Sequence, residues 1–393
     1  MTTKFVYITQ QIGNSHDQFG LSGRMIEEEC KRSGIEFLQI DIRDSETFRL
    51  FTSQLENPDN IIQLNNWMYD YRSSFFHSSV SSNIDLLDCP AKCFANIGDH
   101  PFATFMIDRI SRASPNVNYC LTDRMFHNSF SDISGFNPRV FSSISYPLPR
   151  VNINNLSSLS IRPIEILVPS NIGDLIQTIS FSNKLKNYYP YLSEIFTEDP
   201  YIRLANHYSL VDCALTSRDG VSLKDLAVRD KELHREICIQ CGISDHNARR
   251  AYRIRMLKLL SESCPELNFH VLGQKAEEIH SSNVNWLGFQ PFSMVLRLIA
   301  NSRVVLHFHP TYFKGHHERP FLAASLGTPT ITPESSWITN EYNSWMFQFS
   351  TVQEFRECIY SLKYSLSDEF YREHIPNIFE RYGTSAYISF LTK

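Results

Sequence analysis

The stretch from residue 302 to residue 338 constrains the fold of this chain more than any other part. Residues 304–306 form a short apolar run typical of a buried strand. A polar loop follows, residues 321–324 begin a helix that Gly327 ends, and residues 330–332 form a second short strand. This order places a helix N-terminus at the carboxyl edge of a parallel sheet. Unpaired backbone N–H groups and the helix dipole bind anions at such an edge.

The loop in this stretch is rich in ring nitrogens and charged groups, namely His307, His309, Lys314, His316, His317, Glu318 and Arg319, with Gly315 among them. Arg319 offers a planar fork for phosphate or carboxylate, or it forms a salt bridge within its own domain. Lys314 is a helper in anion binding or an exposed loop lysine. His316 and His317 can orient phosphate or sugar hydroxyls. They could also bind a metal, but no Asp or Glu at ligand spacing completes a site, so we predict none.

Residues 249–340 resemble the donor-binding half of GT-B glycosyltransferases. Four segments occur in the expected order: residues 268–273 resemble "vxvxG", residues 283–288 resemble "nVxxlG", residues 292–300 the following helix, and residues 315–329 the signature "G-x-heR-x-fEA-x-a-x-G-x-P". Leu322 stands where the family usually has a ribose-binding Glu. The resemblance implies a nucleotide-sugar site formed by Arg319, Glu318, His316, His317, Lys314, Gly315, Glu334, Gly273 and His309, with Arg319 stabilising the leaving diphosphate.

The rest of the chain alternates between strands and helices. We predict strands at residues 4–9, 36–40, 61–64, 93–97, 117–121 and 164–168, and helices at residues 21–33, 101–112, 123–130 and 248–263. The opening βαβ unit lacks G-x-G-x-x-G spacing, so a dinucleotide is not indicated. Residues 150–160 are rich in Ser and Asn and predict a linker, and the mostly helical residues 170–247 predict an insertion.

These observations and the resemblance together predict an α/β fold of the GT-B type, in which two Rossmann-like domains face each other across a cleft. Residues 1–155 would be the acceptor domain, and residues 156–370 the donor domain with the helical insertion. Residues 371–393 would form a helical segment that crosses back to the first domain, with interruptions at Pro376 and Gly383.

A transferase that inverts the anomeric centre needs a general base for the acceptor hydroxyl. Two loops of the N-terminal half follow predicted strands and reach the carboxyl edge of the sheet. His16 and Asp17 lie in the first, and His100 lies in the second, beside the helix-capping Asp99. We predict that the base is one of Asp17, His16 and His100.

Composition narrows the class of protein. A chain of 393 residues with 42% hydrophobic and 20% charged residues suits two globular domains, and its net charge of −5 gives no general attraction to nucleic acid. No apolar run approaches the roughly 20 residues of a membrane span. The start MTTKFVYITQQ lacks a signal-peptide pattern, and nine scattered cysteines suit a reducing compartment. We therefore expect a cytoplasmic protein, with peripheral membrane association left open.

The leading hypothesis is a metal-independent glycosyltransferase that moves a sugar from a nucleotide-sugar donor to a glycan, lipid-linked or protein acceptor. The nucleotide sugar is a co-substrate, and no cofactor is expected. Two alternatives stay open: a catalytically silent sugar-nucleotide or glycan-binding module, which Leu322 favours, and a GT-B-shaped sugar-nucleotide epimerase, for which the donor loop offers chiefly Glu318 as a carboxylate.

Overall fold

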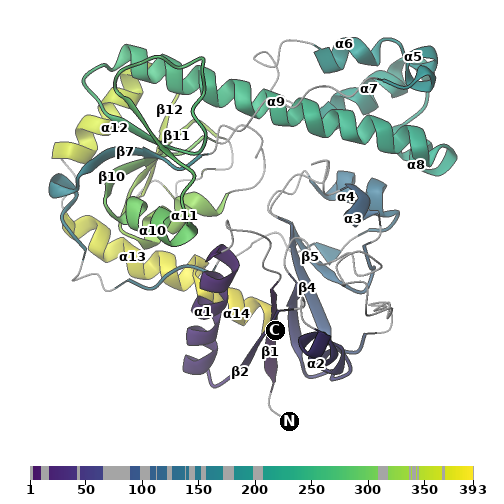
Figure 1. The fold of residues 1–393 in the computed structure, drawn as a ribbon, viewed down its shortest axis with the longest axis horizontal. Coiled ribbons are helices and arrows are strands. Elements are labelled where there is room, and N and C mark those ends of the chain that lie inside the picture. The colour runs from purple at the N-terminus through teal and green to yellow at the C-terminus, as the bar shows by residue number, and fades with distance from the viewer. Residues whose placement is uncertain are drawn as a thin grey trace.

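The computed structural model describes residues 3–9, 17–41, 45–64, 89–97, 107–111, 113–121, 126–137, 139–140, 147–151, 156–170, 181–197, 207–308, 317–335, 338, 342, 345–364 and 368–392. Two six-stranded parallel sheets organise these residues, one in each half of the chain (Figure 1). The predicted α/β class with two Rossmann-like sheets is confirmed.

The first sheet has the strand order β2-β1-β3-β4-β5-β6. Its strands are β1 (Lys4–Thr9), β2 (Glu36–Asp41), β3 (Ile61–Leu64), β4 (Lys92–Ile97), β5 (Asn118–Leu121) and β6 (Arg139–Val140), and its helices are α1 (Asp17–Arg32), α2 (Ser45–Leu55), α3 (Ile107–Ile110) and α4 (Phe126–Ser134). Along β1, Val6 and Ile8 belong to one buried cluster, whereas Phe5 and Tyr7 belong to another. Both faces of the sheet are therefore covered, which explains the unbroken apolar run in the sequence.

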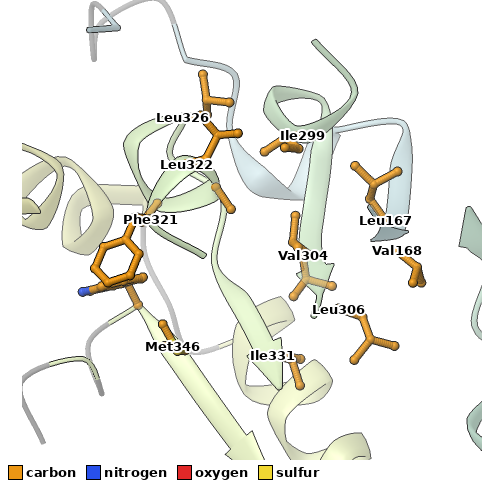
Figure 2. Packing of buried hydrophobic residues seen from close by; sticks show 14 of the residues in the cluster. Leu167, Val168, Ile299, Val304, Leu306, Phe321, Leu322, Leu326, Ile331 and Met346 are labelled. Carbon is orange, nitrogen blue, oxygen red and sulfur yellow. The ribbon is translucent and has the colours of Figure 1, made fainter. Parts of the chain in front are cut away.

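The second sheet has the order β12-β11-β10-β7-β8-β9. Its strands are β7 (Ile164–Val168), β8 (Phe269–Leu272), β9 (Val284–Gly288), β10 (Ser302–Leu306), β11 (Thr330–Pro333) and β12 (Met346–Phe349), accompanied by the short η3 (Leu159–Ile161) and by helices α10 (Phe292–Ala300), α11 (Glu318–Ser325) and α12 (Val352–Tyr364). Figure 2 shows how Ile299 of α10, Val304 of β10 and Leu322 of α11 pack within one apolar core. The strand order reverses between β7 and β10, and open parallel sheets bind ligands at such a switch point.

A helical insertion separates β7 from β8. It consists of α5 (Asn183–Tyr188), α6 (Leu192–Thr197), α7 (His207–Asp219), α8 (Leu223–Arg229) and the start of α9 (Lys231–Ser263). The predicted helix start at residue 248 was wrong, because α9 is one uninterrupted helix of 33 residues, about 50 Å long. In Figure 1 it extends from the insertion to the second sheet. Among the described residues, no helix is long and apolar enough to cross a membrane.

The last two helices, α13 (Asp368–Tyr382) and α14 (Thr384–Thr392), connect the two halves of the molecule. Helix α14 packs against α1 of the first half. The Oη of Tyr387 donates a hydrogen bond of 2.5 Å to Oε1 of Gln63 in β3, and Thr384 Oγ1 donates to the carbonyl of Leu148 at 3.1 Å. Helix α13 runs through Pro376, which we had predicted as an interruption, and only Gly383 separates the two helices.

Two predicted helix boundaries in the first half differ from the structure. Helix α1 begins at Asp17 rather than at residue 21, because the polar residues ahead of the apolar run suit a first helical turn. Helix α4 begins at Phe126 and continues to Ser134, where Gly135 ends it with a φ of +78°.

Candidate functional site

A pocket of about 190 Å³ lies at the carboxyl edge of the second sheet, next to the switch point. The ends of β7, β8 and β9 form one side of it, and helices α10 and α11 form the other. Its lining residues are Pro169, Leu272, Gly273, Phe289, Gln290, Phe292, Val295, Ile299, Glu318, Arg319 and Leu322. The pocket is therefore apolar at its base and carries two charged side chains at its helical side.

Gly273 forms the turn directly after β8. Its φ of +96° is a backbone conformation that side chains disfavour. Its N–H donates to the carbonyl of Gly288 at 2.8 Å, which fixes the end of β8 against the end of β9. A residue without a side chain at this position leaves the backbone open to close approach by a ligand.

The N-terminus of α11 faces the same pocket. His317 caps the helix, and its Nδ1 accepts a hydrogen bond of 3.2 Å from the backbone N–H of Arg319. The Nη1 of Arg319 donates to Oγ of Ser170, at 3.4 Å, beyond the end of β7. The guanidinium, the first-turn N–H groups and the helix dipole together favour an anion here.

Leu322 is only 3% exposed and lies one helical turn after Glu318, on the same face of α11. The leucine belongs to the core that Figure 2 shows, close to Ile299 and Leu326. The residue that departs from the family signature therefore contributes apolar surface to the pocket. Glu318 is the carboxylate that the described pocket offers in its place.

The structure brings three of the predicted donor residues together: Gly273, Glu318 and Arg319 line one pocket. His317 lies beside them as the helix cap, with its ring centroid 5.3 Å from that of the buried His307. Glu334 lies apart, after β11. It is exposed and accepts a hydrogen bond of 2.6 Å from Oγ of Ser350.

Several predicted site residues fall outside the described part of the chain: His16, His100, His309, Lys314, Gly315 and His316. Asp17 begins α1, but its side chain is outside the description too. The prediction of a general base among Asp17, His16 and His100 therefore stays a prediction.

Sequence reasoning missed Ser170, Phe289 and Gln290. Ser170 follows the strand predicted at residues 164–168, and Phe289 follows the segment at residues 283–288 that resembles the family, so their positions directly after these segments were the available signal. Phe289 is 70% exposed although it is aromatic. Gln290 is held in place because its Nε2 donates to the carbonyl of Leu287 at 2.5 Å.

No group of three or more metal-ligating side chains occurs among the described residues. Cys238 and Cys241, the only CxxC pair in the sequence, lie buried in α9, and burial raises the pKa of both thiols well above their ordinary value. The thiol of Cys238 lies 3.5 Å from Nε2 of His234. Neutral buried thiols of this kind are core groups.

Comparison with known proteins finds a glycosyl transferase-like family that matches residues 249–381. Comparison with curated protein sequences finds no significant match. Solved structures of similar shape include TarM of S. aureus in complex with fondaparinux, α-GlcNAc-glycerol and UDP, at 10% identity and a TM-score of 0.42. That match covers 88% of this chain and 58% of TarM, so the chain spans less than two thirds of TarM's length.

Two further solved structures match over nearly the whole chain. AviGT4, a glycosyltransferase involved in avilamycin A biosynthesis, has 10% identity and a TM-score of 0.49, and the match covers 99% of this chain and 95% of AviGT4. The sucrose-phosphate synthase of Thermosynechococcus elongatus has 8% identity and a TM-score of 0.46, over 99% of this chain and 98% of its own. The residues that match the glycosyl transferase-like family, 249–381, include β8, β9, α10 and α11, which supply most of the pocket lining.

Proposed function

We propose that this chain is a glycosyltransferase that transfers a sugar from a nucleotide-sugar donor to a glycan, lipid-linked or protein acceptor. One observation carries the proposal. Within the glycosyl transferase-like segment, Gly273, Glu318 and Arg319 converge on one pocket at the carboxyl edge of the sheet. A helix N-terminus with an arginine is suited to a diphosphate leaving group.

The pocket volume of about 190 Å³ limits the part of the donor that it can hold. Typical ligand pockets measure about 300–1,000 Å³. We therefore assign to it the diphosphate, near Arg319, and the adjoining ribose, for which Glu318 supplies a hydrogen-bond acceptor. Phe289, which is exposed at the rim, offers an aromatic face to the base.

In the proposed reaction, a bond forms between the acceptor oxygen and the anomeric carbon while the bond from that carbon to the phosphate oxygen breaks. The negative charge that develops on the diphosphate is stabilised by Arg319 and the N-terminus of α11, so no metal or other cofactor is required. If the enzyme inverts the anomeric centre, the acceptor proton passes to one of Asp17, His16 and His100. We place this reaction in the cytoplasm, with peripheral membrane contact left open.

A second candidate, a silent sugar-nucleotide or glycan-binding module, is favoured by the burial of Leu322 at the family's ribose-binding position. Mass spectrometry distinguishes the two, because an active enzyme releases nucleoside diphosphate from one of a panel of nucleotide sugars. The same assay with EDTA tests metal independence, and loss of activity that Mn²⁺ or Mg²⁺ restores would contradict it.

The donor site is tested by calorimetry with UDP, GDP and ADP. Arg319→Ala should weaken binding of the preferred nucleotide by about 1.5–3 kcal/mol, the value for a hydrogen bond to a charged group. Arg297→Ala is the matched control, since it removes the same charge from an exposed position of α10 outside the pocket lining. Unchanged affinity in a folded Arg319→Ala variant would remove this arginine from the site.

A further inference from the structure

A second and larger pocket, of about 920 Å³, lies between the first domain and the helical insertion. Helices α3 and α4 and the turn after α4 form one wall, and α8 and the first turns of α9 form the other. Figure 1 shows α3 and α4 opposite α8. The volume is within the range of ligand sites, and such sites occur preferentially between domains.

Contacts between the first domain and the insertion hold the two sides of this pocket together, and Ile107 of α3 belongs to the apolar cluster of the insertion. Tyr208 of α7 donates a hydrogen bond of 2.6 Å from its Oη to Oδ2 of Asp132 in α4. His234 of α9 is buried at the base of the pocket, with its ring against the thiol of Cys238. These contacts hold the two sides of the pocket in place without a ligand, and such preorganisation lowers the entropic cost of binding.

The wall that the insertion supplies is basic. Lys224 of α8 and Lys231 and Arg235 of α9 line it, and Asp132 is the one carboxylate among the described lining residues. Lys231 and Arg235 lie one turn apart on the same side of α9. Of the nearby carboxylates, Asp225 accepts a hydrogen bond from Ser222 and also interacts with the charge of Lys224, whereas Asp230 pairs with Lys184.

The wall that the first domain supplies mixes polar and apolar side chains and carries one charged group, Asp132. Four of its residues have hydroxyl or amide side chains, namely Ser111, Ser131, Ser134 and Asn137. The hydroxyls of Ser131 and Ser134 donate to the carbonyls of His127 and Phe136, so they can serve sugar hydroxyls as acceptors, whereas the amide of Asn137 can both donate and accept. The pocket thus places three cations on one side and, on the other, hydroxyl and amide groups with a single carboxylate, in a chain whose net charge is −5.

We propose that this pocket binds the acceptor, and that the acceptor is an acidic glycan, a carbohydrate chain with carboxylate or phosphodiester groups. The inference rests on the proposed function, since a transferase needs an acceptor site in addition to a donor site. The acidic groups would face Lys224, Lys231 and Arg235, and the sugar hydroxyls would face the serines and Asn137. Helices α3 and α4, which form the wall opposite the cations, follow β4 and β5 of the first sheet.

The test is calorimetric titration of the full chain at low salt with four probes of similar length. They are a hyaluronan hexasaccharide, which carries carboxylates, a glycerol-phosphate hexamer, neutral maltohexaose, and a single-stranded DNA hexamer. We expect one or both of the first two probes to bind, the stronger one identifying the anionic group, and maltohexaose and DNA to bind at least tenfold more weakly.

The variant Lys224→Ala/Lys231→Ala should weaken binding of the acidic probe by about 2- to 30-fold, which is the range for the loss of two exposed ion pairs. It should leave the affinity for UDP unchanged. The control variant Lys186→Ala/Lys258→Ala removes two lysines from exposed helix positions outside this pocket. It should behave like the native chain. Affinity should also fall as salt rises, because exposed charges are screened.

Four outcomes decide the matter. Binding of the acidic probe that depends on Lys224 and Lys231 supports the inference. Nucleotide binding without acidic-probe binding overturns the inference and leaves the proposed function standing. Equal binding of DNA, or equal weakening in the control variant, overturns it as well, because the attraction is then a general one. Acidic-probe binding without binding of any nucleotide or nucleotide sugar supports a glycan site and overturns the proposed transferase.

Discussion

Gly327, which ends α11, shows at the scale of single residues how backbone and packing constraints combine. Its φ is +67°, and a Cβ added there would meet Leu156 Cδ1 at 2.6 Å and Ile375 Cδ1 at 3.3 Å. Gly327→Ala should therefore lower the free energy of unfolding by about 2–5 kcal/mol, the sum of the left-handed backbone cost and of overpacking. Urea unfolding measures it.

Gly220 is the control for this prediction, because its φ is +64° but nothing lies within 4 Å of an added Cβ. Gly220→Ala should cost only about 1–2 kcal/mol, which is the backbone contribution. Equal costs at the two glycines would show that Leu156 and Ile375 move aside freely.

His234 is a second residue whose environment has a measurable consequence, because its burial makes the stability of the protein depend on pH. The side chain is only 7% exposed, and burial lowers its pKa to about 4. The pKa of an unfolded-chain histidine is about 6.5, so the fold favours the neutral ring. This contribution to stability is complete above about pH 6.5 and is lost as the pH falls toward 4, by about 3 kcal/mol.

His234→Gln should therefore lose about 2–3 kcal/mol less stability than the native chain between pH 7 and pH 4.5. The measurement is urea unfolding at both values, where acidic groups contribute equally to the two proteins. A parallel loss in both would mean that the ring is protonated in the folded protein.

At the scale of secondary-structure elements, the buried Arg162 joins three segments just before β7. Its Nη1 donates to the carbonyl of Ser302 at 3.0 Å and to Oγ1 of Thr328 at 2.8 Å, and its Nε donates to the carbonyl of Ser157 at 3.1 Å. The segment between the two sheets is thereby attached to β10 and to the turn before β11.

Arg162→Leu should lower the free energy of unfolding by about 3 kcal/mol or more, because the partner oxygens lose charge-assisted donors in a buried site. Arg255→Leu, at an exposed position of α9, should change it by less than about 0.5 kcal/mol. Thermal and urea unfolding of both variants provide the comparison. A small effect at Arg162 would mean that water replaces it.

At the scale of the whole molecule, α14 connects the second half of the chain to the first. Tyr387, which is 1% exposed, reaches Gln63 of β3, and the guanidinium of Arg150 lies 4.6 Å from the ring centroid of Phe379 in α13. Contacts so far apart in the sequence make the relative position of the two sheets depend on the last helices of the chain.

Tyr387→Phe should lower stability by about 1–3 kcal/mol, since Oε1 of the buried Gln63 loses its donor. Hydrogen exchange of α14 amides should accelerate by the corresponding factor, because the lost hydrogen bond attaches this helix to β3. Tyr188→Phe is the control, at a tyrosine that is 67% exposed. Exchange that accelerates equally throughout the chain would show that α14 does not open separately.

Local sequence patterns were sufficient to predict many of the strands and helices. The strands at Lys4–Thr9, Ile61–Leu64 and Ile164–Val168 and the helix at Phe292–Ala300 were predicted with their observed bounds, because apolar runs and punctuating residues are local signals. Helix α9 was predicted too short. The stretch after β7 is too long for a single crossover helix, so residues up to 247 were assigned to a separate insertion, whereas in the structure α9 begins at Lys231 and packs against α7 and α8.

The sequence by itself determined the parallel α/β class and placed Gly273, Glu318 and Arg319 at strand and helix ends, since each depends on a few neighbouring residues. Only the tertiary structure decided that these three line one pocket with Phe289, and that Lys224 and Lys231 lie across a second pocket from Asp132. The proximity of such residues in space depends on strand order and on the packing of helices that are far apart in the chain, and short-range sequence patterns do not encode either.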